Sequence, residues 1–247
     1  MKVYGLIGNP LGHSFSKQYF TEKFEKEQLT DCRFELYPLE NIHELTSLLN
    51  SVPGLNGLAV TIPYKEVILP FLNFVDEEAA IIGAVNCIKI SAGKLLGYNT
   101  DSIGFKRSLI PLLQSHHTKA LVLGSGGSSR AVQYVLRKLN IDFLVVTRNE
   151  ILLEGFIHYD LISENIMHQY PLIINCSPVG MFPHENNKPA IPYQYLNKGH
   201  LLFDLVYKPV ETYFLKEAKL RGSAVKNGFE MLVIQAEESW KIWNEKN

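Results

Sequence analysis

Three closely spaced glycines between an apolar run and an amphipathic segment constrain the fold of this chain more than any other feature. The stretch LVLGSGGSSRAV covers residues 121–132, and its glycines are Gly124, Gly126 and Gly127. Apolar residues then recur at i, i+3, i+4 and i+7 across residues 132–139, which indicates a helix with one apolar face. A strand, a glycine turn and a helix in this order predict a βα unit whose turn can hold a phosphate at the helix N-terminus. The alternative is an ordinary βα turn that binds nothing.

The rest of the chain repeats this alternation of short apolar runs and longer amphipathic stretches, which predicts an α/β fold. The expected strands are residues 3–8, 33–39, 57–62, 121–123, 143–147, 172–175 and 201–206. The expected helices are residues 42–50, 64–71, 101–113, 129–139 and 229–243, preceded by one that starts at Ser14 or Ser16 and contains Phe20 and Phe24. Residues 85–98, interrupted at 91–93, are typical of a β-hairpin.

The polar segment at residues 114–118 separates two such series, and a length of 247 residues suits two modest domains. We expect residues 1–101 and 227–247 to form an α/β domain with a parallel sheet. Residues 102–226 are expected to form a Rossmann-type domain that contains the glycine turn. The helix at 229–243 is apolar over most of its circumference, so it is expected to pack back on the first domain.

Composition excludes several classes of protein. A formal net charge of −1 leaves no basic surplus for nucleic acid or an anionic membrane. The first apolar run is too short for a signal peptide, so a cytoplasmic protein is expected. The 3 cysteines form no CxxC pair, and none of the 8 histidines belongs to an HExxH motif, so neither a disulfide framework nor a metal site is expected.

The end of the second strand in the Rossmann-type domain indicates the kind of nucleotide. In a site for NAD, an acidic residue at this position bonds the ribose hydroxyls. Here residues 143–147 lead to Arg148. A guanidinium suits a ribose 2′-phosphate, which favours NADP (NADPH) as cofactor. The alternative is that Arg148 is a solvent-exposed loop arginine.

Polar side chains follow several strands of the first domain, at the ends where ligands of open α/β sheets bind. They are Ser14, Ser16, Thr61, Lys65, Asn86, Asn99, Thr100 and Asp101. Hydroxyls, amides, one ammonium and one carboxylate together suit a small polyhydroxy carboxylate. Each residue alone has a structural alternative: a helix cap, a strand edge, a turn or a solvated lysine.

The motifs and their order resemble the shikimate dehydrogenase family over nearly the whole chain. In the first domain the similar segments are GNPLGHSFS (8–16), VTIPYK (60–65), GAVN (83–86) and NTDSIG (99–104). In the second they are the glycine turn (124–131), NCSPVGM (175–181) and DLVY (204–207) with Pro209 and Thr212. The series ends with Asn227, Gly228, Met231, Gln235, Ala236 and Trp243.

The resemblance implies a role for each matching residue. The catalytic pair would be Lys65 and Asp101. The substrate-binding residues would be Ser14, Ser16, Thr61, Asn86, Tyr207 and Gln235. The cofactor-binding residues would be Gly124, Ser125, Gly126, Gly127, Ser128, Ser129, Thr147, Arg148, Asn149, Leu205 and Gly228.

The resemblance further implies reversible NADPH-dependent reduction of 3-dehydroshikimate to shikimate, a step in aromatic amino-acid biosynthesis, by a monomer or homodimer. Reducing a ketone leaves an alkoxide that needs a proton, and a partly desolvated lysine can supply one. Asp101 would orient Lys65. Burying the amide of Gln235 among apolar neighbours is costly without a partner, which favours a ligand-facing role. The alternative is a core glutamine bonded to backbone.

Two departures from the family pattern affect this interpretation. Ala59 stands where the family usually has asparagine, which bears on the shape of the substrate pocket. Residues 147–149 read Thr-Arg-Asn in place of the usual Asn-Arg-Thr, no further basic residue follows in 150–154, and the segment 149–169 is short, so lower NADP affinity is expected. The alternatives are a quinate/shikimate dehydrogenase that prefers NAD, a non-catalytic nucleotide-binding regulator of the same fold, and a small-molecule methyltransferase.

Overall fold

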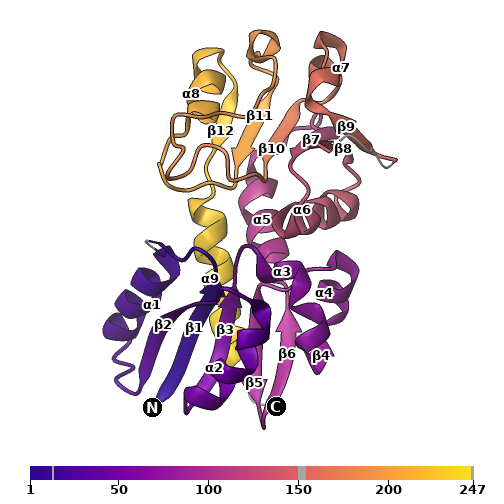
Figure 1. Ribbon diagram of the computed structural model, residues 1–247. Helices are drawn as coiled ribbons and strands as arrows, with labels where there is room; N and C mark the ends of the chain where they lie inside the picture. Colours follow the sequence, from indigo (N-terminus) through magenta and orange to yellow (C-terminus); the bar gives the residue numbers. More distant parts are fainter. Residues whose placement is uncertain (13, 150–153, 246–247) are drawn as a thin grey trace. The chain divides into compact units, whose positions relative to one another are not determined.

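The computed structural model describes residues 1–12, 14–149 and 154–245, in two compact units (Figure 1). One unit is Met1–Thr100 with Gln235–Asn247, and the other is Asp101–Ile234. The chain returns to the first unit at Gln235, within the last helix, whereas the sequence predicts this boundary at residue 227, ahead of that helix. The described residues do not include residue 13, which belongs to the GNPLGHSFS motif. They also do not include residues 150–153, which belong to the segment where no further basic residue follows Arg148.

The first unit contains a mixed sheet of six strands in the order β2, β1, β3, β5, β6, β4. The strands are β1 (Lys2–Gly8), β2 (Cys32–Pro38), β3 (Leu55–Val60), β4 (Phe74–Val75), β5 (Cys87–Ser91) and β6 (Lys94–Tyr98). Strand β1 is parallel to β2 and β3, whereas β5 is antiparallel to β3 and β6. The expected hairpin at 85–98 is therefore formed by β5 and β6.

Helices cover both faces of this sheet. An aromatic cluster on one face joins α1 (Phe15–Lys26) and the C-terminal part of α9 (Phe229–Asn244) to the strands. The opposite face carries α2 (Leu45–Ser51), α3 (Tyr64–Val67) and α4 (Glu77–Ile82). Side chains of β1 enter the two clusters alternately, because successive residues of a strand point to opposite faces.

Prolines shorten two of the expected helices. The helix expected at 64–71 is α3 followed by a 3₁₀ turn, Leu69–Phe71, that contains Pro70. The helix expected at 101–113 is α5 (Asp101–Leu109) followed by the 3₁₀ turn Ile110–Leu112, which contains Pro111. Proline lacks an N–H and clashes with the preceding helical turn, so the α-helix ends before it.

The second unit contains a parallel sheet of six strands in the order β12, β11, β10, β7, β8, β9. The strands are β7 (Lys119–Leu123), β8 (Asp142–Thr147), β9 (Phe156–His158), β10 (Leu172–Asn175), β11 (Leu201–Asp204) and β12 (Ala224–Lys226). This is the Rossmann order, and its direction of winding reverses between β7 and β10, where open α/β sheets bind ligands.

The helices of the second unit also lie on both faces of its sheet. Helices α5 and α6 (Gly127–Lys138) pack on one face through the cluster that contains Phe105 and Val132. Helices α7 (Glu164–Gln169) and α8 (Tyr213–Leu220) pack on the other face through Met167 and Phe214. The amphipathic helix expected after the glycine turn is thus confirmed as α6.

Trp243 anchors the end of α9 in the first unit. Its side chain is buried, its ring stacks on Tyr4 with centroids 5.1 Å apart, and its Nε1 donates to the carbonyl of Ile88 over 3.0 Å. Gly57 of β3 makes room for the ring, because a Cβ at that position would lie 2.5 Å from two atoms of the indole. The helix therefore rests directly on the sheet at this point.

We expect Trp243→Ala to lower the free energy of unfolding by about 3–5 kcal/mol, because it removes a large buried side chain and leaves a cavity. Trp243→Phe keeps most of the volume and loses the hydrogen bond, so we expect a loss of about 1–2 kcal/mol. Urea denaturation monitored by circular dichroism measures both. Equal losses in the two variants, or no loss in either, would contradict the anchoring role.

Candidate functional site

A buried polar cluster joins the hairpin to the last helix in the first unit. Asn86 precedes β5 and Thr100 follows β6, so strand pairing brings the two residues together. The amide N–H of Thr100 donates to Asn86 Oδ1 over 2.6 Å, and Asn86 Nδ2 donates to Thr100 Oγ1 over 3.0 Å. Gln235 Oε1 of α9 accepts from Asn86 Nδ2 at 3.3 Å and from Thr100 Oγ1 at 3.4 Å.

Ser239, one turn further along α9, completes this cluster. Its hydroxyl lies 3.0 Å from Thr100 Oγ1 and donates to the backbone carbonyl of Gln235 over 2.8 Å. Sequence reasoning missed Ser239 and noted Thr100 without a role. It left open whether Gln235 is a core residue bonded to backbone. The structure shows that its side-chain oxygen accepts from two other side chains. We call Asn86, Thr100, Gln235 and Ser239 the amide cluster.

Backbone hydrogen bonds join the segment that contains Thr61 and Lys65 to the segment that contains Asn86 of the amide cluster. Thr61 follows β3 directly, and Lys65 is the second residue of α3. The amide of Val60 donates to the carbonyl of Asn86 over 2.8 Å, and that of Val85 donates to the carbonyl of Lys65 over 2.7 Å. The backbone thus holds the half-buried Lys65 next to the segment that carries Asn86.

The loop after β1 leads through Ser14 into α1, which contains Ser16, and this loop borders the loop after β3. The amide of Asn9 donates to the carbonyl of Ile62 over 3.0 Å, and this bond ties the two loops together. Ser14 occupies the N-cap position of α1, but its side chain makes no capping hydrogen bond. Ser16 lies in the first turn of the same helix. Four of the predicted substrate residues, Ser14, Ser16, Thr61 and Asn86, therefore belong to one end of this sheet.

The glycine turn of the second unit has the geometry that a bound phosphate requires. Gly124 has φ +106°, a conformation that favours glycine, and a Cβ there would lie 3.3 Å from the amide nitrogen of Ser177. Around Gly126 a Cβ would meet no atom within 4 Å, so a ligand can approach the backbone. The first N–H groups of a 12-residue helix, α6, follow without carbonyl partners inside the helix. The residues present fit a pyrophosphate.

Ser129 differs from the other predicted residues of the turn. It is fully buried, and its hydroxyl accepts from Gln133 Nε2 over 3.0 Å. Its side chain therefore packs inside the unit, where the usual third glycine would allow close contact between helix and sheet. Ser125 is exposed and Ser128 half-buried, so both are nearer the surface of the turn.

Arg148 lies at the end of β8 and is exposed, as is Asn149. The amide of Asn149 donates to Thr147 Oγ1 over 3.2 Å, which shapes the turn that presents the guanidinium. Burial raises the pKa of nearby Tyr159 to about 12, and the positive charge of Arg148 opposes that rise. An anionic group placed at this turn would meet an exposed positive charge.

Asp204 is the centre of a second buried network, at the end of β11. Its Oδ1 accepts from Asn175 Nδ2 over 2.9 Å and from the amide of Val206 over 3.0 Å, and its Oδ2 accepts from Thr212 Oγ1 over 2.6 Å. Asn175 Oδ1 in turn accepts from the hydroxyl of Ser177 over 2.6 Å. These bonds fix the loops after β10 and β11. Sequence reasoning noted Asn175, Asp204 and Thr212 as motif members without a structural role.

The fixed loops carry the remaining predicted residues of the second unit. The amide of Leu205 donates to the carbonyl of Asn175 over 2.9 Å, and Gly228 packs against Leu205 so closely that a Cβ would lie 2.1 Å from its carbonyl oxygen. Tyr207 lies on the same loop and is half-buried.

Asp101 is the buried first residue of α5, where the helix dipole favours a carboxylate.

The described residues contain no group of three or more histidine, cysteine, aspartate or glutamate side chains that could hold a metal ion. None of their helices is long and apolar enough to cross a membrane.

Known proteins are similar to this chain over nearly its whole length. The family profile described as the shikimate dehydrogenase substrate-binding domain matches residues 6–88. A shikimate dehydrogenase (NADP(+)) of Methanococcus aeolicus is 37% identical over 98% of this chain and 91% of its own length. The structure of shikimate dehydrogenase from Aquifex aeolicus has a TM-score of 0.87 and 32% identity, covering 99% of this chain and 92% of that one. Shikimate 5-dehydrogenase from Thermus thermophilus, in complex with NADP(H) and shikimate, has a TM-score of 0.86 and 30% identity, covering 99% and 94%.

The burial of Asp204 predicts a pH-dependent stability. Burial raises its pKa from 3.8 to about 6, although the bonds from Thr212, Val206 and Asn175 act in the opposite direction. Because the folded chain binds this proton more tightly than the unfolded chain, the free energy of unfolding falls as the pH rises from about 4 to about 6. We expect this group to contribute a fall of up to about 3 kcal/mol.

Urea denaturation between pH 4 and 7, compared for the wild type and Asp204→Asn, measures this contribution. Asparagine does not titrate, so we expect the variant to lack that part of the fall. Asp142→Asn, at an exposed carboxylate of β8, serves as the matched control and should keep the wild-type profile. Parallel profiles for the wild type and Asp204→Asn would show that Asp204 has an ordinary pKa.

Proposed function

The chain belongs to the shikimate dehydrogenase family, and we propose that it catalyses the reversible NADPH-dependent reduction of 3-dehydroshikimate to shikimate in the shikimate pathway. The amide cluster is the observation that carries the proposal. It joins Asn86 to Gln235, two predicted substrate residues 149 positions apart, at the end of the sheet where Thr61 and Lys65 also lie. Converging amides and hydroxyls of this kind suit the hydroxyl groups of a small ring acid.

We assign the substrate contacts by chemical type. The hydroxyls of Ser14 and Ser16, at the N-terminus of α1, bind the ring carboxylate, where the helix dipole also favours a negative charge. The side chains of Thr61, Asn86, Gln235 and Tyr207 bind the ring hydroxyls, because amides and hydroxyls can both donate and accept hydrogen bonds.

Lys65 moves the proton of the reaction. Bound NADPH supplies a hydride to the carbonyl carbon, and the carbonyl oxygen then needs a proton. The ammonium of Lys65 gives its proton to that oxygen in the direction of reduction, and the neutral amine accepts the proton from the hydroxyl in the direction of oxidation. Asp101 orients Lys65 and accepts a hydrogen bond from the neighbouring substrate hydroxyl.

The second unit holds the cofactor in this proposal. The turn formed by residues 124–128 and the N-terminus of α6 would hold the pyrophosphate. Arg148 would hold the 2′-phosphate with support from Thr147 and Asn149, and Leu205 and Gly228 would hold the nicotinamide end of the cofactor. We also propose a cytoplasmic location, with which the absence of disulfides among the three cysteines of the described residues is compatible.

We expect Lys65→Ala to lower kcat by a factor of about 10² to 10⁴, the usual contribution of a positioned acid or base, with a smaller effect on the KM for shikimate. Absorbance of the reduced nicotinamide measures the rate with shikimate and NADP. Lys94→Ala, at an exposed lysine of β6, is the control and should keep the wild-type rate. Undiminished activity in Lys65→Ala would remove Lys65 from the mechanism. NADP binding without turnover of shikimate or quinate in the wild type would favour the non-catalytic regulator.

We expect Arg148→Ser to raise the KM for NADP by a factor of about 10 or more, because a charge-assisted bond to the 2′-phosphate contributes about 1.5–3 kcal/mol. The KM for NAD should change little, since NAD lacks that phosphate. Initial rates with each cofactor measure the two effects. Equal changes for NADP and NAD, or wild-type preference for NAD, would identify Arg148 as an ordinary loop arginine and favour the NAD-preferring alternative.

A further inference from the structure

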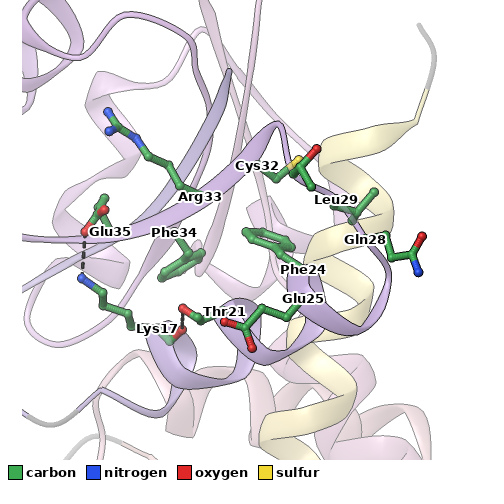
Figure 2. Close-up of a pocket in the computed structure, with 11 residues that line it drawn as sticks. Lys17, Thr21, Phe24, Glu25, Gln28, Leu29, Cys32, Arg33, Phe34 and Glu35 are labelled. Carbon is green, nitrogen blue, oxygen red and sulfur yellow. Dashed lines mark hydrogen bonds and ion pairs between the residues drawn. The ribbon is translucent and has the colours of Figure 1, made fainter.

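Helix α1 carries Ser14 and Ser16 at its N-terminus, so its position matters for the proposed substrate site. A surface hollow of about 440 Å³, lined by residues of α1 and β2, lies on one side of the helix (Figure 2). Lys17 Nζ lies 2.8 Å from Glu35 Oε2 of β2, but both side chains are exposed, and an exposed ion pair contributes little to stability. Contacts on another side of α1 therefore decide its position more strongly.

Tyr19 and Lys23 face the opposite side of α1, where they meet α9. At 3.6 residues per turn, their side chains are offset by about 200° from Lys17 and Thr21, which line the hollow. The phenol of Tyr19 donates to Glu237 Oε1, and Lys23 Nζ lies 3.0 Å from the same carboxylate. Glu237 thus holds two consecutive turns of α1 at once.

The contact between α1 and Glu237 is partly shielded from water. The side chain of Lys23 is 11% exposed, and its Nζ lies 2.6 Å from Glu27 Oε1 and 5.9 Å from the centroid of the Trp240 ring. Burial raises the pKa of Tyr19, and its bond to Glu237 raises it further, so the phenol keeps its proton and donates. Because water screens such groups less than exposed ones, this contact constrains the two helices more than a surface ion pair does.

Both ends of this contact lead to proposed substrate residues. On α9, Glu237 lies two residues after Gln235 of the amide cluster. On α1, the ring of Tyr19 stacks on Phe15 with centroids 5.4 Å apart, and Phe15 stands between the two serines. Ser14 makes no capping hydrogen bond through its side chain, so this stack contributes to holding the first turn of the helix.

We propose that Glu237 is a positioning residue for the substrate, a role that rests on the proposed function. It sets the distance between the two serines, which bind the ring carboxylate, and Gln235, which binds ring hydroxyls. A small rigid ring must reach both groups at once, so a shift at either end weakens binding. Lys65 acts on the carbonyl oxygen and Glu237 does not enter that step, so the KM for shikimate depends on Glu237 more than kcat does.

Steady-state rates with shikimate at saturating NADP test this role. Tyr19→Phe keeps the ring that stacks on Phe15 and loses only the donor, whereas Glu237→Ala loses the acceptor. We expect each to raise the KM for shikimate by a factor of about 3 to 10, the contribution of one hydrogen bond, with kcat within about twofold of the wild type. Glu237→Gln keeps an oxygen that can accept from Tyr19, so it should restore most of the affinity lost in Glu237→Ala.

A double-mutant cycle with Ser16→Ala separates positioning from general stabilisation. Once the hydroxyl of Ser16 is absent, its position no longer matters, so Tyr19→Phe should raise the KM less in this background than in the wild type. Glu22→Gln, at an exposed carboxylate of α1, is the matched control and should keep the wild-type KM. Circular dichroism establishes that each variant is folded at the assay temperature.

Three results would overturn the positioning role and leave the proposed function intact. They are a wild-type KM in both Tyr19→Phe and Glu237→Ala, a kcat that falls as much as the KM rises, and effects of Tyr19→Phe and Ser16→Ala on the KM that multiply in full. A wild type that does not turn over shikimate would instead overturn the proposed function, and this role with it.

Discussion

The amide cluster is the interaction on which the first unit depends. Asn86, Thr100 and Gln235 are polar side chains in a largely apolar setting, and an amide buried there without partners is costly. The three residues form hydrogen bonds with one another, so the hairpin and α9 must pack together for these bonds to form. Trp243 adds a second constraint, since its ring fills the space that Gly57 leaves on the sheet. The two contacts fix both the position of α9 along its axis and its rotation about that axis. The last helix is therefore a structural support that also carries one of the proposed substrate-binding residues, Gln235.

A related constraint orders the loops of the second unit. Asn175 and Asp204 end adjacent parallel strands, and their side chains bond to each other and to the loops that follow. Burying the carboxylate of Asp204 is unfavourable, but three donors offset much of that cost. The glycine turn lies next to these loops, because Gly124 has no Cβ to keep Ser177 away. In both units, then, polar side chains at strand ends hold the loops that carry the proposed ligand-binding residues.

The sequence predicts the parts of the fold whose signals are local. The run of β7, the turn at Gly124 and the apolar face of α6 lie within about twenty consecutive residues, and the hairpin of β5 and β6 is equally local. The elements it missed are mostly short, such as the two residues of β4 and the three of β9 and β12, which are too short to show a period. Ser239 escapes prediction, as does the bond between Thr212 and Asp204, because only tertiary packing brings these residues to their partners. Full burial of Ser129 was not foreseen for the same reason.

The most direct test of the account is a double-mutant cycle on Asn86→Ala and Gln235→Ala, measured as the KM for shikimate with NADP. If both side chains bind substrate as one bonded unit, each substitution raises the KM by a factor of about 10 or more, and the double substitution raises it by less than the product. Binding of NADP, which involves the other unit, should keep its wild-type dissociation constant. A wild-type KM in either variant, or two fully independent effects, would contradict the claim that the amide cluster is the core of the substrate site.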